Sequence, residues 1–236
     1  MSSKDSKEPL LGTIASLHES GAYSDFKIVC GPETYNVHRN IVCPQSDFFR
    51  AACRPHTFRE GKTGIVTIPA NAGRDMGALS SPLAPEEFSW DLDVEDVKTI
   101  KAMIHYFYHH DYPSDKPTHV DHAKLTSANI AKGVLAEHAK MYAIGEKYGI
   151  AGLKGLAAKR FGEDFQNTFA GLGTAIVIAF KSTPETDQTL RKLIVDKLCS
   201  YRWVAANGVV DEAVEQIPEL VHSLYRRLLG QTGTSR

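Results

Sequence analysis

The sequence lacks an excess of charge of either sign. Its 236 residues include 27 Lys or Arg and 28 Asp or Glu, which leaves a formal net charge of −1. A tail or patch that binds nucleic acid through its phosphates needs a clear excess of basic residues. The charge balance therefore argues against such a tail, and we expect no nucleic-acid partner.

Long hydrophobic runs are also missing. No segment approaches the roughly 18 uninterrupted apolar residues that a membrane-spanning helix needs. The opening residues, MSSKDSKEPLLG, contain no apolar core of the length found in secretory signal peptides. We therefore expect no membrane partner and a location in the cytoplasm or nucleus. With 42% hydrophobic residues the chain can still bury a core, and its length allows one or two domains.

Cysteine is scarce and shows no pairing pattern. The four cysteines are Cys30, Cys43, Cys53 and Cys199, and they form no CxxC pair and no zinc-ligand spacing. In a reducing compartment such residues act as small, mostly buried thiols. We therefore expect neither disulfides nor a cysteine-bound metal.

Complete catalytic motifs are absent as well. No G-x-S-x-G nucleophile elbow occurs anywhere. Residues 60–64 contain the Gly-Lys-Thr with which a phosphate-binding loop ends, but His56 occupies the position of the first glycine of that motif. Gly171 and Gly173 resemble the start of a dinucleotide motif, but Ile176 replaces its third glycine. We therefore predict that the chain is not an enzyme and binds no cofactor.

Two groups of polar residues leave a choice between chemistry and structure. Asp25 and His38 form either an acid–base pair or a structural pair that satisfies buried polar groups, and the lack of a nucleophile favours structure. Five histidines lie close together in the chain: His105, His109, His110, His119 and His122. His105 and His109 are four residues apart and would share a helix face, which is one way to begin a metal site. A solvated polar loop is the simpler interpretation, and we predict no metal.

The spacing of apolar residues predicts a helix followed by a hairpin. Leu10, Ile14 and Leu17 recur at helical intervals, and the helix should end near Gly21. Residues 26–30 and 34–37 read as two strands joined by a Gly-Pro-Glu turn.

A short helix and a third strand follow the hairpin. Ser46 is a suitable N-cap for a helix whose first turn carries Asp47. Its buried face is predicted to comprise Phe48, Phe49, Ala52 and Cys53. Residues 65–68 form a β-branched strand between a glycine and a proline.

The rest of the chain reads as helical, apart from two long loops. A helix is predicted to start at Asp93, and further helices cover the region up to 164 and the segment 165–229. One loop occupies residues 69–93 and is punctuated by Gly, Ser and Pro, and the other is a polar segment at 109–132 that contains Pro113 and Pro117.

This order of elements and motifs resembles the BTB/POZ domain. The resemblance rests on the hairpin after Asp25, on His38-x7-Ser46-x2-Phe49, on Tyr106 to Tyr112, and on the Ala- and Tyr-bearing run 139–148. The long loops and the Asp-Tyr-Pro ending at 111–113 look like filamentous-fungal members. The resemblance implies a structural role for seven residues that match positions of the family motif: Asp25, His38, Ser46, Phe49, Tyr108, Tyr142 and Tyr148.

The resemblance implies an α+β fold. It implies a small three-stranded mixed sheet flanked by helices, with an all-helical C-terminal extension. We expect an N-terminal segment at 1–21, a BTB domain at 22–164, the helical extension at 165–229 and a disordered tail at 230–236.

The resemblance also implies a function in binding other proteins. Cullin-binding members carry a hydrophobic-x-Glu triplet in the loop between the Ser-capped helix and the third strand, and Phe58-Arg59-Glu60 matches it in that predicted loop. Dimeric members pack their N-terminal helix on a partner subunit, which makes Leu10, Ile14 and Leu17 the candidate dimer interface. Two functions stay open: an adaptor that links a cullin ubiquitin-ligase scaffold to a client, and a self-associating scaffold or transcriptional-regulator component that binds no cullin.

Overall fold

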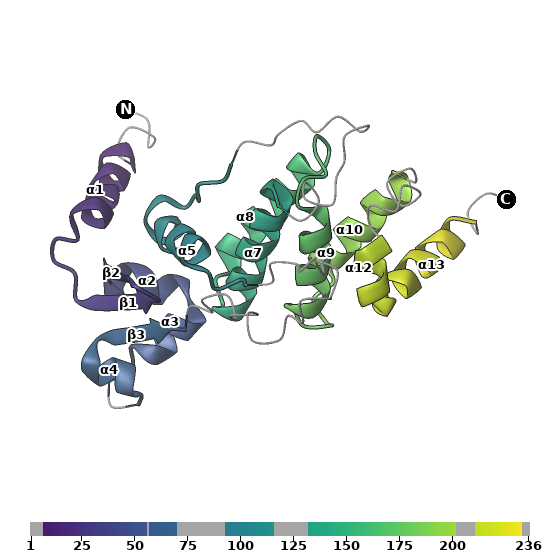
Figure 1. Ribbon diagram of the computed structural model, residues 1–236. Helices are drawn as coiled ribbons and strands as arrows, with labels where there is room; N and C mark the ends of the chain where they lie inside the picture. Colours follow the sequence, from purple (N-terminus) through teal and green to yellow (C-terminus); the bar gives the residue numbers. More distant parts are fainter. Residues whose placement is uncertain (1–6, 56, 70–92, 116–131, 202–210, 233–236) are drawn as a thin grey trace, which may run out of the picture. The chain divides into compact units, whose positions relative to one another are not determined.

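The computed structural model describes residues 7–55, 57–69, 93–115, 132–201 and 211–232 (Figure 1). The chain divides into two compact units that interleave along the sequence. The first comprises residues 1–85, 93–113 and 144–155, and the second comprises residues 86–92, 114–143 and 156–236.

A three-stranded mixed sheet forms the centre of the first unit. Strand β1 (Phe26–Cys30) pairs antiparallel with β2 (Glu33–Val37) and parallel with β3 (Ile65–Ile68), so the strand order is β2-β1-β3. The tight hairpin pairs Cys30 with Glu33, which is the arrangement expected for a Gly-containing two-residue turn. The parallel pair needs a crossover, and short helices supply it.

The helices of the first unit are short between the strands and longer around them. The described ones are α1 (Lys7–Ser20), α2 (Arg39–Val42), a 3₁₀ helix (Cys43–Gln45), α3 (Asp47–Ala52), α4 (Arg59–Thr63) and α5 (Val97–His109). Helix α1 ends where predicted, because Gly21 adopts a positive φ of 61° and its N–H donates to the carbonyl of Leu17.

The core of this unit lies on one face of the sheet. Alternate residues of β1 point inward, so that Phe26, Ile28 and Cys30 are buried. Helix α5 buries Met103 and Phe107 within the same unit. These observations confirm the predicted fold: a small mixed sheet with flanking helices.

The second unit is helical throughout its described part. Its helices are the first part of α7 (Val134–Lys147), most of α8 (Ala151–Asp164), α9 (Leu172–Lys181), α10 (Thr189–Ser200), α12 (Asp211–Gln216) and α13 (Pro218–Thr232). No helix in the described ranges is long and apolar enough to cross a membrane.

Helix α9 is the buried centre of the second unit. Every residue from Leu172 to Ala179 is buried, as its nearly continuous apolar sequence predicts. Gly171 precedes it with a positive φ of 83°, and a Cβ there would lie 2.6 Å from the backbone nitrogen of Ala136. At the other end, the guanidinium of Arg191 donates to the carbonyls of Ala179, Phe180 and Thr183 and so satisfies the helix terminus.

Three local predictions need correction. Helix α5 begins at Val97 and not at Asp93, because Asp96 is the residue whose carboxylate accepts from the N–H of Thr99, at 2.7 Å. Phe48 does not share the buried face of α3. Its side chain is 42% exposed because the helical twist separates it from Phe49. Helix α13 extends to Thr232, into the predicted tail.

The predicted domain limits remain predictions, because the two units interleave in sequence. The loop at 69–93 lies almost entirely outside the described residues, as do most of the loop at 109–132 and residues 233–236.

Candidate interaction surfaces

The motif residue His38 is held inside the first unit by three hydrogen bonds. Its Nε2 lies 2.7 Å from the carbonyl oxygen of Ala22, which can only accept, so Nε2 carries the proton. In the neutral ring, Nδ1 then accepts from the hydroxyl of Tyr108 at 2.8 Å, while that hydroxyl accepts from the His38 backbone N–H at 3.0 Å. Burial raises the pKa of Tyr108 to about 12, so the phenol stays protonated. This network is structural.

Asp25 has a separate role from His38. Its Oδ1 accepts from the backbone N–H of Arg39 at 2.8 Å, which fixes the first turn after the hairpin. The predicted alternative of an Asp25–His38 acid–base pair is therefore not formed, since each side chain has other partners.

Ser46 ties α3 to the segment after α7. Its hydroxyl donates to the carbonyl of Tyr148 at 2.6 Å and accepts from the N–H of Phe49 at 3.2 Å. The rings of Phe49 and Tyr148 stack with centroids 5.7 Å apart. The three motif positions thus form one buried contact, which sets where α3 lies.

Glu95 completes this contact, although no motif in the sequence pointed to it. Its buried carboxylate accepts from the Tyr148 hydroxyl at 2.5 Å and pairs with Lys147 at 2.7 Å. Burial, followed by the hydrogen bond to Glu95, raises the pKa of Tyr148. In the second unit, the remaining motif residue, Tyr142, donates to the carboxylate of Asp187 at 2.7 Å.

The predicted cullin-binding triplet lies on a helix and not in a loop. Phe58 is the N-cap of α4 and is 50% exposed, and Glu60 lies in the first turn. Gly64 ends the helix with a positive φ of 68°, and its N–H donates to the Glu60 carbonyl at 2.8 Å. Gly61 packs directly on the chain after α3, because a Cβ there would lie 2.2 Å from the carbonyl oxygen of Arg54. The triplet is therefore presented from a fixed turn of helix.

The predicted dimer residues differ in exposure along α1. Leu10 is 61% exposed, whereas Ile14 and Leu17 are half-buried. Leu11, which the sequence analysis did not single out, is 50% exposed. Since α1 contacts α5, Ile14 and Leu17 belong to the side that covers the first unit, and the first turns of α1 are the accessible part.

A comparison with protein-family models matches residues 14–79 to the BTB/POZ domain. The match covers the hairpin, helices α2 to α4 and strand β3, in the order described above. The chain carries a BTB/POZ domain. No curated protein matches the chain significantly.

BTB domains are protein-interaction modules and are generally not enzymes. The BTB domain therefore supports a role in binding other proteins. Among the described residues, no three His, Cys, Asp or Glu side chains are placed to hold a metal ion. His105 and His109 do share a face of α5, with rings stacked at 3.9 Å, whereas His119 and His122 lie outside the described residues.

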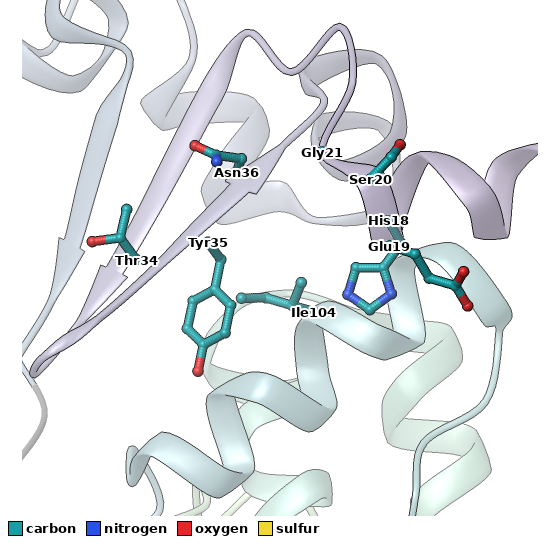
Figure 2. Close-up of a pocket in the computed structure, with 8 residues that line it drawn as sticks. All are labelled: His18, Glu19, Ser20, Gly21, Thr34, Tyr35, Asn36 and Ile104. Carbon is teal, nitrogen blue, oxygen red and sulfur yellow. The ribbon is translucent and has the colours of Figure 1, made fainter.

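The BTB domain also has a pocket of about 220 Å³ between α1, β2 and α5. It is lined by His18, Glu19, Ser20, Gly21, Thr34, Tyr35, Asn36 and Ile104. In Figure 2, Ile104 lies between the ring of Tyr35 and the imidazole of His18. The sequence analysis missed His18, since its position relative to α5 depends on the tertiary fold.

Proposed function

We propose that this BTB protein is an adaptor that links a cullin ubiquitin-ligase scaffold to a client protein. The single observation that supports the proposal most is the exposure of Phe58 beside Glu60 on α4. A half-exposed aromatic ring next to a carboxylate suits an interface hot spot, because the ring supplies apolar area and the charge orients the partner.

The neighbouring elements also carry exposed apolar side chains. Helix α4 contacts α3 and β3, and each of these carries an exposed apolar side chain, Phe48 and Ile65 respectively. Under this proposal the chain itself performs no chemistry, and the recruited enzymes transfer ubiquitin. The protein would act in the cytoplasm or nucleus, where the ligase scaffold works.

Binding of a cullin N-terminal region to the double variant Phe58→Ala, Glu60→Ala tests the proposal. We expect the wild type to bind at micromolar concentration or tighter, and the variant to lose at least about 30-fold in affinity, since a hot-spot side chain contributes about 2 kcal/mol or more. Pull-down followed by titration calorimetry measures this. The melting temperature should stay nearly unchanged because Phe58 is exposed and Glu60 is only half-buried.

The matched control is Tyr225→Ala with Glu219→Ala, which removes an exposed aromatic ring and a carboxylate from α13. This control should bind like the wild type. A wild-type protein that shows no cullin binding at micromolar concentration would contradict the adaptor function.

A second candidate function is a self-associating scaffold that binds no cullin. The observation that favours it is the exposure of Leu10 and Leu11 at the start of α1, because adjacent exposed leucines are suited to contact with a second copy.

A further inference from the structure

Three histidines from two helices meet at the contact between α1 and α5. His18 of α1 places its Nδ1 3.2 Å from the Nε2 of His109. The rings of His105 and His109 stack at 3.9 Å, and the ring of His18 stacks on that of Tyr108 at 4.8 Å. Imidazole rings from both helices are thus part of the contact between α1 and α5.

The hydrogen bonds in this group fit neutral imidazoles. The bond between His18 and His109 needs one donor and one acceptor, so both rings cannot be fully protonated while it exists. His105 donates from Nδ1 to the carbonyl of Asp111 at 2.9 Å, which leaves its Nε2 without a proton in the neutral form.

The surrounding charges do not offset the cost of protonation. Burial and then the imidazoles of His109 and His105 lower the pKa of His18. The carboxylate of Glu19 opposes this shift, and Lys101 on α5 adds to it.

The same balance holds for His109. Burial and then His105 lower its pKa, against smaller opposing effects of Glu19 and Asp111. Strand β2 lines the pocket beside His18 with Thr34, Tyr35 and Asn36. Of these three side chains only Tyr35 can ionise, and burial raises its pKa to about 12.

We propose that His18 and His109, with the ring of His105 stacked on His109, form an acid-sensitive latch, which keeps α1 docked on α5 while the imidazoles of His18 and His109 are neutral and releases it when these two take up protons. Protonation of both His18 and His109 places like charges in contact and breaks the His18–His109 hydrogen bond. The inference rests on the geometry of the BTB domain and does not depend on cullin binding or on self-association.

Release of α1 would change the surface of the domain. It would expose the face of the Tyr108 ring that His18 covers and would open the pocket, since His18 to Gly21 form one of its walls (Figure 2).

The direction of the effect follows from proton linkage. Docking lowers the pKa of His18 and His109 from the ordinary value of about 6.5, so the undocked form binds more protons. Docking is therefore unaffected well above about pH 6.5 and weakens as the pH falls through that value. At about pH 5.5, each imidazole that must stay neutral lowers the equilibrium constant for docking of α1 by up to about tenfold.

Hydrogen exchange of the full chain tests the latch. Peptides that cover α1 are compared at about pH 7.5 and about pH 5.5 in the presence of EDTA, with labelling times scaled for intrinsic exchange. We expect the protection of α1 to fall at least about tenfold at the lower pH, while peptides of β1 and α5 keep their protection. His18→Phe keeps a ring on Tyr108 and removes a titratable group, so α1 should remain protected at both pH values.

His109→Gln is a second variant, which keeps a hydrogen-bonding group beside His18 and should also reduce the pH effect. His222→Gln on α13 is the control and should behave like the wild type. Equal protection of α1 at both pH values in the wild type would overturn the proposal, and so would an unchanged loss of protection in a folded His18→Phe or His109→Gln protein.

Discussion

At the scale of single residues, the motif positions of the BTB domain are mostly hydrogen-bond partners of the backbone. Asp25 accepts from the N–H of Arg39, His38 donates to the carbonyl of Ala22, and Ser46 bonds both Phe49 and Tyr148. Polar side chains at these points satisfy backbone groups where a strand or helix begins or ends. The motif thus fixes how the short elements connect.

Ser46→Ala should lower the free energy of unfolding by about 2 kcal/mol, because it removes an N-cap and a buried hydrogen bond together. The Tyr148 carbonyl keeps a weaker partner in the N–H of Phe48, at 3.4 Å, which limits the loss. Urea unfolding measures the change. Ser46→Thr should recover most of it, and Ser223→Ala, which removes a hydroxyl on the surface of α13, should have little effect. An unchanged free energy of unfolding in the Ser46→Ala variant would show that the cap does not stabilise α3.

At the scale of elements, α4 is held by a close approach that only glycine allows. A Cβ at Gly61 would lie 2.2 Å from the Arg54 carbonyl oxygen and 3.4 Å from that of Ala52. Because these are backbone atoms, the helix must move to accept a side chain. The same helix carries Phe58 and Glu60, so the position of the candidate interaction surface depends on this contact.

Gly61→Ala should therefore destabilise the protein by about 1–3 kcal/mol, although alanine is the better helix former. Gly155→Ala is the matched control: Gly155 is also helical, but no atom lies within 4 Å of its added Cβ. That variant should be neutral or more stable by up to about 1 kcal/mol. Urea unfolding compares the two, and equal effects would mean that α4 is not packed as described.

Much of the element pattern could be predicted from sequence because it depends on local signals. Ser46 as an N-cap, Gly21 after α1 and the β-branched strand at 65–68 are short-range patterns. The contacts between distant segments could not be predicted in the same way. Glu95 beside Tyr148 and His18 beside His109 are 53 and 91 residues apart, so only the folded chain brings them together.

At the scale of the whole molecule, oligomeric state tests the second candidate function, the self-associating scaffold. An exposed apolar pair at the start of α1 and an apolar stripe on α13, with Val221, Tyr225 and Leu228, are both available for contact with another copy. We expect the pair on α1 to form the contact, and a two-fold interface would bring this surface of both subunits together.

Light scattering coupled to gel filtration distinguishes the two surfaces. We expect the wild type to elute with twice the mass of one chain at tens of micromolar, and Leu10→Ser with Leu11→Ser to shift it towards the monomer, because each buried leucine contributes about 1.5–3 kcal/mol to association. Val221→Ser with Tyr225→Ser, the matched change on α13, should leave the mass unchanged. Circular dichroism checks that both variants remain folded. A monomeric wild type would rule out the self-associating scaffold, and dissociation by the α13 variant alone would place the interface on the C-terminal helix instead.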